Sequence, residues 1–476
     1  MQLERNTALQ EMLLGALPDG VVVTNADSLE AYRFDRAEDP RAPLPIAVVR
    51  AGTTEHVQIA VQIAAKAGVP IVPRGAGTGL SAGASSADPA IVISLERMRE
   101  IAIDQDTRVA VVQPGALNAE VKQAAAAQGL WYPPDPSSYE ISSIGGNIAT
   151  NAGGLCCVKY GVTADYVLGL TVVLADGRAV TLGGPRLKDV SGLALTKLFV
   201  GSEGTLGIVT EAVLRLIPTQ PAKTTLVAVF HELGAAMNSV VDITRSHRPS
   251  MMEFMDGVAI RAIEDDRRMG LDRDAAGMLI MQLDEGGAEA ATAVEAICAQ
   301  HGATECYSTT DPDEGEQFVE ARRAALPALE KLGSLLLEDI GVPVSKLAEL
   351  MLGVQSIAAK HDVTISVSAH AGDGNTHPLI VLDRHDPAQQ LRAQAAYGDV
   401  MALAMRLEGT ISGEHGVGRL KAPWLEQSIG GDAYELNLRI KAAFDPEGIL
   451  NPGAKFVSSK TIPSPQLAHM KESTTQ

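Results

Sequence analysis

The sequence predicts a chain of the α+β class that is built from two domains. Its 476 residues exceed the roughly 150 of a common single domain. Residues 41–218 alternate short β-branched strands with helices and glycine turns, whereas residues 219–440 alternate longer strands with longer helices. The segment FDPEGILNPGAKF near the end, at 444–456, has two prolines and two glycines in thirteen residues. The length and the change of pattern near residue 219 predict the two domains, and the Pro- and Gly-rich segment ends the ordered chain.

The first domain begins with a β-α-β unit. Residues 46–50 and 70–75 predict strands, and the helix between them can start at Thr53 or Thr54 and end at Gly68. Further strands are predicted at 90–95, 109–115 and 168–180, and a helix at 119–130. The pattern indicates a mixed α/β domain with many short strands.

The second domain is predicted to be α+β and mostly antiparallel. A strand is expected at 224–230, and helices are expected at 235–246 and 288–300. A long helix is expected from Glu314 to Leu337, with a kink at Pro327. The polar tail from Val457 predicts disorder.

Composition excludes several classes of protein. The formal net charge is −19, which argues against a nucleic-acid binder with a basic face. No apolar run approaches the ~20 residues of a membrane span, and the N-terminus lacks the pattern of a secretory signal. Four cysteines, Cys156, Cys157, Cys298 and Cys306, make no disulfide framework. We therefore expect a cytoplasmic protein, with peripheral contact to a membrane as the alternative.

Three glycine-rich stretches stand out, at 73–83, 133–154 and 201–209. Closely spaced glycines let backbone N–H groups approach an anion such as a pyrophosphate. The first stretch follows a strand, but no helix pattern follows it, its spacing is not GxGxxG, and it lacks the lysine of a P-loop. A Rossmann site is therefore disfavoured. Any one stretch fits a plain turn; three in one domain favour a binding site.

A histidine pair marks the second domain. Residues 363–369 and 378–383 predict two strands, and Asp373-Gly374 between them is a strong two-residue turn. Such a turn would place His370 directly opposite His377, at a separation that suits two imidazoles on one metal. The competing interpretation is a hairpin with two surface histidines.

Two further charged pairs are candidates for chemistry. Glu414-His415 lies between glycines in ISGEHGVG, which indicates an exposed loop, and a carboxylate with two histidines matches a catalytic metal site. Arg322-Arg323 lies on a predicted helix and could bind a carboxylate. A solvated surface pair is the alternative in both cases.

The motifs together resemble a known family. PIVPRGAGTGLSAG, IGGNIATNAGG, YGVTADYVLGLTVVLADG and VGSEGTLGIVTE are similar to the PCMH-type FAD-binding domain of the vanillyl-alcohol oxidase superfamily. HAGDGNTHP, SGEHGVG and FDPEGILNPGAKF resemble the FAD-linked 2-hydroxy-acid dehydrogenases, in the branch of D-lactate dehydrogenase and glycolate oxidase. The resemblance implies an FAD domain at 1–218 completed by 441–456, a substrate cap domain at 219–440, and a flexible tail at 457–476.

The resemblance also implies the cofactor and its contacts. Some relatives attach FAD through a histidine in the first loop; residues 74–83 contain none, so non-covalent FAD is expected. The implied FAD-binding residues are Pro73, Arg74, Gly75, Ala76, Gly77, Thr78, Gly79, Ser81, Pro134, Ser137, Ser143, Gly145, Gly146, Asn147, Thr150, Asn151, Gly153, Glu203, Gly204, Gly207, Ile208 and Asn451.

For the reaction, the resemblance implies that His370, His377 and Glu414 bind a divalent metal, zinc or manganese, that His415 is the general base, and that Arg322 binds the substrate carboxylate. A small D-2-hydroxy acid would be oxidised to the 2-oxo acid, with hydride transfer to the flavin N5. The acceptor of the electrons would be a quinone, a cytochrome or an electron-transfer flavoprotein. The oligomeric state is not readable, and a homodimer is one arrangement left open.

Three alternatives remain at this stage. Relatives that act on D-2-hydroxyglutarate carry an Asn and a Lys where this chain has Leu379 and Leu337, so a monocarboxylic substrate is favoured. A non-redox flavoenzyme similar to alkyl-glycerone-phosphate synthase needs a basic phosphate pocket, and no cluster of Lys or Arg is visible. A non-catalytic FAD-binding subunit of a larger oxidase complex would tolerate degraded motifs, yet both histidine motifs are intact.

Overall fold

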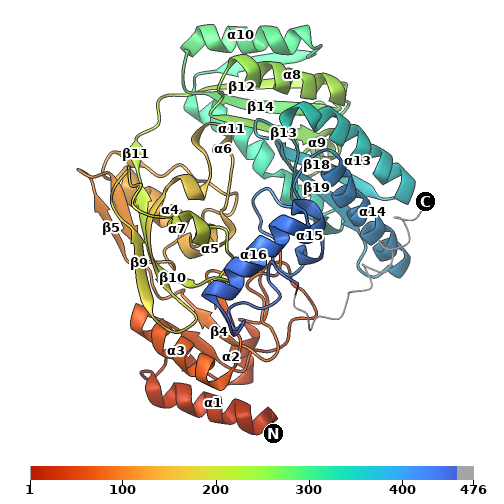
Figure 1. The fold of residues 1–476 in the computed structure, drawn as a ribbon. Coiled ribbons are helices and arrows are strands. Elements are labelled where there is room, and N and C mark those ends of the chain that lie inside the picture. The colour runs from red at the N-terminus through yellow and green to blue at the C-terminus, as the bar shows by residue number, and fades with distance from the viewer. Residues whose placement is uncertain (1, 458–476) are drawn as a thin grey trace. The chain divides into compact units, whose positions relative to one another are not determined.

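A computed structural model describes residues 2–457 (Figure 1). The tail expected after Val457 lies outside the described residues. The chain divides into two compact units: the first unit holds residues 1–152, 162–219 and 415–476, and the second unit holds residues 153–161 and 220–414. Because residues of both units mix helices and sheets in a two-part fold, the predicted α+β class is confirmed.

One sheet of the first unit contains the predicted β-α-β unit. Its order is β1-β2-β4-β3, and β4 pairs in parallel with both β2 and β3. Helix α3 begins after the cap Thr53, whose side chain accepts from the His56 amide, and ends at Gly68 in the left-handed conformation, as predicted. Helix α1 packs on α3 through a shared apolar core (Figure 1). The bounds are α1 Gln2–Ala16, β1 Val22–Val23, α2 Ala26–Glu30, β2 Val48–Arg50, α3 Thr54–Ala67, β3 Ile71–Arg74 and β4 Ile91–Ser94.

The other large sheet of the first unit is antiparallel, with the order β5-β6-β10-β8-β9. Short helices and a two-stranded ribbon surround it, and its core includes Tyr132, Phe199 and Leu214. The bounds are β5 Ile101–Asp104, β6 Val109–Val112, α4 Asn118–Ala126, β7 Leu130–Trp131, α5 Ile144–Thr150, η1 Thr163–Asp165, β8 Val167–Val173, β9 Ala179–Gly183, α7 Leu195–Phe199, β10 Ile208–Arg215 and β11 Ile217–Pro218.

The C-terminal segment returns to the first unit, which the chain re-enters at His415. After α15 (Ala422–Ile429) and α16 (Gly431–Phe444), the chain runs beside β3. The Ile71 amide donates to the Ile449 carbonyl at 2.8 Å, and the Asn451 amide donates to the Ile71 carbonyl at 2.8 Å. These two backbone bonds add the last described segment to the edge of the first sheet.

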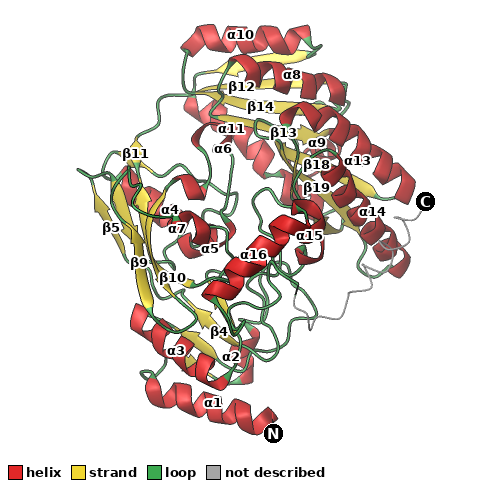
Figure 2. Cartoon of the chain, in the orientation of Figure 1, coloured by secondary structure: helices red, strands yellow, loops and turns green. Residues whose placement is uncertain are grey.

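The second unit is built on one antiparallel sheet of eight strands, in the order β15-β12-β14-β13-β18-β19-β16, with β17 also on β19 (Figure 2). The predicted antiparallel α+β domain is therefore present. The bounds are β12 Thr224–Phe230, β13 Met251–Asp256, β14 Gly277–Leu283, β15 Glu305–Thr309, β16 Ser334–Leu337, β17 Ile340–Gly341, β18 Thr364–His370 and β19 Asn375–Leu382.

Helices cover this sheet. The apolar side chains of one face, such as Met255 and Leu379, pack with Ile263 of α9, Val319 of α11 and Leu329 of α12. The helix bounds are α6 Cys157–Tyr160, α8 Leu233–Ser246, α9 Gly257–Arg267, α10 Gly287–Gln300, α11 Pro312–Arg323, α12 Ala325–Glu330, η2 Val344–Lys346, α13 Leu347–His361 and α14 Pro387–Arg406. The face under α9, α11 and α12 is the one that carries the candidate site.

The single long helix predicted from Glu314 to Leu337 is wrong. The chain forms α11, breaks at Ala324, forms α12, and then enters strand β16. Pro327 does not kink a helix; it lies in the first turn of α12, where its missing N–H needs no partner. Residues 334–337 become a strand because β19 offers them a ladder of backbone hydrogen bonds, which outweighs the helical pattern.

Residues 153–161 leave the first unit and join the second. Lys159 Nζ pairs with Asp284 Oδ1 at 2.5 Å, and the Tyr160 hydroxyl donates to the other oxygen of the same carboxylate. The Gln220 side-chain amide donates to Asp284 at 3.3 Å. Because the Asp284 side chain is fully buried, these three donors anchor the segment to the end of β14.

Candidate functional site

The three central strands of the second unit place the candidate metal ligands on one face of the sheet. Glu253 in β13 is the register partner of His370 in β18, and His377 in β19 is the partner of Ser368. Since side chains alternate along a strand, Glu253 shares its face with Met255, and His377 shares its face with Leu379. This is the face that α9, α11 and α12 cover.

The predicted two-residue turn between the histidines is wrong in its register. Residues 371–374 form a four-residue turn, so that His370 lies opposite Asn375 and diagonally from His377. The amides of Asp373 and Gly374 both donate to the His370 carbonyl at 3.2 Å, which closes the wider turn. Diagonal neighbours on one face are within reach of long side chains. The two imidazole rings still meet, with centroids 5.1 Å apart and planes at 85°.

Glu414 completes a group of three possible metal ligands. Its Oε1 atom lies 3.3 Å from His370 Nε2 and 3.3 Å from His377 Nε2. One ligand atom from each residue lies within 4.8 Å of the other two, and all three side chains are largely buried. Two imidazole nitrogens and one carboxylate form a donor set that suits zinc, manganese or iron. The donors therefore fit a divalent metal.

A second carboxylate supports His370 from behind. Glu253 Oε1 accepts from His370 Nδ1 at 2.6 Å, and Glu253 Oε2 forms an ion pair with Arg322 Nε of α11 at 3.0 Å. Arg322 is therefore placed at this face of the sheet, whereas its neighbour Arg323 pairs with Glu316 and Glu320 at the exposed surface of the helix. The structure thus separates two arginines that the residue pattern, without the family resemblance, could not distinguish.

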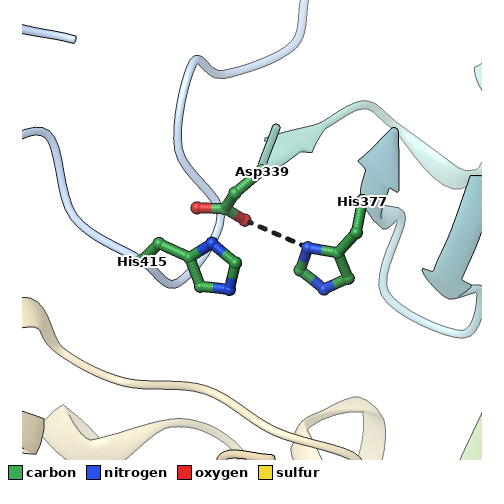
Figure 3. A group of neighbouring side chains, drawn as sticks. All are labelled: Asp339, His377 and His415. Carbon is green, nitrogen blue, oxygen red and sulfur yellow. Dashed lines mark ion pairs between the residues drawn. The ribbon is translucent and has the colours of Figure 1, made fainter. Parts of the chain in front are cut away.

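Asp339, between β16 and β17, holds the loop that carries Glu414. Its carboxylate accepts from the Glu414 amide at 3.1 Å and from the Ser412 hydroxyl at 2.8 Å. It also pairs with His377 Nδ1 at 4.0 Å, as Figure 3 shows together with His415, the residue after Glu414. Asp339 thus holds the backbone of Glu414, and its carboxylate lies near the ring of His377.

The charges around His370 decide its protonation. Burial alone lowers the pKa of the imidazole, but the carboxylates of Glu253 and Glu414 reverse this effect and raise the pKa well above its usual value. Two carboxylates on either side of one imidazole therefore make a place that favours positive charge, as a site for a cation does.

His415, the predicted base, follows Glu414 directly and belongs to the first unit. It is half-buried, and its carbonyl accepts from the Ser81 hydroxyl at 3.4 Å. The Glu203 carboxylate accepts from the amides of Val417 at 2.9 Å and Gly418 at 2.7 Å. The first unit therefore fixes the backbone immediately after His415.

The glycine-rich stretches of the first unit meet at the start of α5. The Ser143 hydroxyl caps this helix by accepting from the Gly146 amide, and it also accepts from the Ala76 amide at 3.2 Å. A Cβ atom at Gly75 would lie 2.3 Å from the Ser143 hydroxyl and 3.4 Å from the Gly146 nitrogen. Only a glycine allows the two backbones to lie so close, so Gly75 lets the first and second glycine-rich stretches meet here.

Several predicted FAD contacts have side chains that hold the protein together. Asn147 accepts from Asn118 at 3.0 Å and donates to Ser142 at 3.2 Å, and Asn151 accepts from the Ala164 amide at 2.8 Å. The Thr150 hydroxyl donates to the Gly146 carbonyl. Contact of these residues with FAD stays a prediction, and it falls on their backbone groups.

Asn451 connects the first glycine-rich stretch, the third glycine-rich stretch and the C-terminal segment. Asn451 donates to the carbonyls of Gly83 and Glu203 at 2.9 and 2.8 Å, and it accepts from Arg419 at 2.7 Å. Arg74 is buried and donates to the Ala84 carbonyl, while the Pro134 carbonyl accepts from Asn118.

The remaining predicted FAD residues lie in the first unit, with one exception. They lie within the three glycine-rich stretches: Pro73, Gly77, Thr78, Gly79, Ser137, Gly145, Gly204, Gly207 and Ile208. Gly153 lies instead in the second unit, where a Cβ atom would stand 2.8 Å from Glu414 Oε2. The structure thus places this glycine against a candidate metal ligand.

Sequence reasoning missed two carboxylates of this site. Glu253 was visible as an acid in the middle of an apolar strand, Met251–Asp256, but no role followed from it. Asp339 follows an apolar strand and precedes a second one, which is a weaker signal. An acid within a run of buried strand residues needs a partner, and that need was the available signal for Glu253.

Comparison with known proteins identifies the class. A family model for an FAD binding domain matches residues 45–183, and a model for the C-terminal domain of FAD linked oxidases matches residues 219–454. The two models define an FAD-linked oxidoreductase. Gly75 and α5 lie within the first matched range.

Curated relatives identify the family. Glycolate oxidase subunit GlcD of Bacillus subtilis is 41% identical over 92% of this chain and 94% of its own length. D-lactate dehydrogenase of Archaeoglobus fulgidus is 36% identical over 89% of this chain and 95% of its own length. The chain belongs to the family of FAD-linked oxidases and dehydrogenases that contains these two proteins, which confirms the resemblance seen in the sequence.

A solved structure supports the fold alone. p-Cresol methylhydroxylase matches with a TM-score of 0.80 and 17% identity, covering 97% of this chain and 98% of the other. This likeness confirms the predicted PCMH-type architecture. Among the described residues, no helix is long and apolar enough to cross a membrane.

Proposed function

We propose that this chain oxidises a small D-2-hydroxy acid with one carboxylate, such as D-lactate or glycolate, to the 2-oxo acid. Support comes from the names of the relatives, a glycolate oxidase subunit and a D-lactate dehydrogenase. The observation that carries the proposal is the convergence of His370, His377 and Glu414, with 3.3 Å from each imidazole to the carboxylate. A flavin oxidoreductase with a buried metal-type site suits the oxidation of an alcohol next to a carboxylate.

The cofactors are FAD, bound non-covalently, and a divalent metal, zinc or manganese. The bound flavin supplies a hydride acceptor, and the metal supplies a Lewis acid that lowers the pKa of the substrate hydroxyl. Amides near Gly75 and α5 would hold the FAD phosphates, and the three ligands of the second unit would hold the metal.

The residues of the chain then have distinct tasks. Arg322 binds the substrate carboxylate, because a guanidinium matches a carboxylate plane. His415 takes the proton of the hydroxyl, since it follows Glu414 and its loop is fixed by Ser81 and Glu203. An imidazole suits this task because its ordinary pKa is close to neutral pH.

The size of the substrate is proposed from two leucines. Leu337 in β16 is the register partner of Leu379 in β19, and Leu379 is two residues after His377 on the same face. Both belong to the apolar core of that face. An apolar wall beside the ligands favours a small side chain over the second carboxylate of D-2-hydroxyglutarate, because a buried unpaired carboxylate is unfavourable.

A second candidate is a flavin subunit of a larger oxidase complex. The relative from Bacillus subtilis carries the word subunit in its name, which favours this possibility. In either case the electrons would leave the flavin for a quinone, a cytochrome or an electron-transfer flavoprotein. Turnover of the purified chain alone with each class of acceptor would separate the two candidates.

The test is anaerobic reduction of the flavin by a panel of D- and L-2-hydroxy acids, with metal analysis of the same sample. We expect D-lactate or glycolate to bleach the flavin, and a chelator to stop the bleaching until zinc or manganese is added back. We expect His370→Ala to abolish reduction and to keep the flavin bound. His231→Ala is the matched control, because His231 is exposed and pairs only with the surface residue Asp272 among the described residues.

Two results would contradict the proposal. A yellow protein that responds to no 2-hydroxy acid, with or without added metal, would favour a non-redox flavoenzyme or a binding subunit. Loss of flavin from His370→Ala would place this residue in the flavin site and remove its role as a metal ligand.

A further inference from the structure

Glu253 is the carboxylate at the centre of the candidate site that no motif explains. Its side chain has no exposed surface, and it lies in β13, between β14 and β18. Its two oxygens face two different elements: Oε1 meets His370 Nδ1 of β18 at 2.6 Å, and Oε2 meets Arg322 Nε of α11 at 3.0 Å. One acid therefore touches both a candidate metal ligand and the proposed substrate-binding arginine.

The contact with His370 fixes the ring. With Glu253 accepting from Nδ1–H, the opposite nitrogen Nε2 is the one that faces Glu414, 3.3 Å away, and is the nitrogen that would bind the metal. A carboxylate behind a ligating histidine selects the tautomer, sets the ring orientation and makes the ligand more basic. Since the distance is short and the pair is buried, the imidazole cannot rotate without breaking a strong bond.

The contact with Arg322 is an ion pair that holds the guanidinium by charge. The Arg322 side chain is only 11% exposed, so a buried acid is needed to balance its charge. Arg323, the next residue on the helix, is exposed and has two surface acids as partners. Helix α11 thus directs Arg322 into the site, where it pairs with Glu253, and directs Arg323 to the surface.

We propose that Glu253 is a positioning residue shared by the metal ligand His370 and by Arg322, so that the geometry of the metal site depends on an arginine that binds no metal. The inference rests on the proposed function for the roles of the two partners. If Arg322 shifts, the carboxylate of Glu253 moves with it, and His370 must then move as well.

The experiment is a double-mutant cycle on metal affinity without any substrate. Glu253→Gln keeps the size of the side chain, and Arg322→Ala removes the partner on the other side. The affinity of the FAD-loaded apo protein for zinc or manganese is measured by calorimetric titration. We expect each single variant to weaken metal binding by about 10-fold or more, and the double variant to be little weaker than Glu253→Gln alone.

Two matched controls separate this role from a loss of fold. Arg323→Ala removes the neighbouring arginine of the same helix, and Asp256→Asn removes the charge of another buried carboxylate of β13, which binds Ser366 and the Val367 amide. Both should leave metal affinity unchanged. Flavin content and melting temperature are measured on every variant, and if Glu253→Gln does not fold, Arg322→Ala against Arg323→Ala still tests the proposal.

Unchanged metal affinity in Arg322→Ala, or effects that add in the double variant, would overturn the shared role. A wild-type protein that binds neither metal would overturn this inference together with the metal part of the proposed function. A wild-type protein that binds metal and shows the predicted cycle, yet oxidises no 2-hydroxy acid, would overturn the proposed function alone.

Discussion

Gly153→Ala tests whether the segment 153–161 shapes the metal site. A Cβ atom at this position would lie 2.8 Å from Glu414 Oε2 and 3.3 Å from Glu414 Cβ. Gly153 is buried, and its φ lies outside the left-handed region, so the substitution adds a methyl group without straining the backbone. The perturbation therefore acts mainly on the carboxylate of Glu414.

The expected magnitude follows from these distances. Ordinary van der Waals contact begins at 3.4 Å, so Glu414 or the segment must move by about 0.6 Å. Metal–ligand distances tolerate only about 0.2 Å. We expect metal affinity to fall about 10- to 100-fold, which corresponds to about 1.4–2.8 kcal/mol.

The assay is titration of the FAD-loaded apo protein with zinc or manganese, with thermal unfolding measured in parallel. Gly234→Ala is the matched control: Gly234 lies in α8 of the same unit, and a Cβ atom there would meet nothing within 4 Å. It should leave metal affinity unchanged and should stabilise α8 by at most about 1 kcal/mol. Equal metal affinity in Gly153→Ala and wild type would refute the reasoning, because it would show that the metal site does not depend on the close approach of this segment to Glu414.

Two further predictions concern the anchors of each unit. Asp284→Asn breaks the buried pair with Lys159 and should lower the free energy of unfolding by about 3 kcal/mol at pH 7, as measured by urea denaturation. Although burial opposes it, Lys159 lowers the pKa of Asp284. The stability that the carboxylate adds is therefore present above about pH 4 and lost as pH falls through the lowered folded pKa, and a difference that does not shrink as the pH falls below about 4 would contradict this. Arg419→Ala removes donors to the carbonyls of Ala82 and Ser85 and to Asn451, so FAD should bind about 10-fold or more weakly in an absorbance titration. Burial lowers the pKa of Arg419 to about 10, and Arg419→Lys should not restore binding, because an ammonium cannot replace the planar fork; full recovery would show that charge alone suffices.

Much of the fold follows from local patterns. Thr53 and Gly68 set the ends of α3, and the β-branched runs of the first unit set its strands, because caps and alternation act over a few residues. One exception also has a physical cause. Residues 334–337 follow a helical pattern but form a strand, since β19 provides hydrogen-bond partners from about forty-five residues away in sequence.

The residues of the candidate site were likewise predictable in part from local patterns. The pattern HAGDGNTHP identified both histidines, but the turn between them is wider than Asp373-Gly374 indicates, and only the sheet register shows that His370 and His377 are diagonal neighbours. The residue pattern alone left Arg322 and Arg323 equal and only the family resemblance singled out Arg322, whereas packing of α11 on the sheet distinguishes the two physically.

The sequence by itself determined the family, the flavin and the three residues proposed to bind metal, because these depend on motifs that lie within single loops and hairpins. The tertiary structure alone decided the carboxylates that support those residues. Glu253 is 117 residues from His370 in sequence, and Asp339 is 75 residues from Glu414. A buried charge needs a partner in space, and no local pattern states which partner the folded chain will supply.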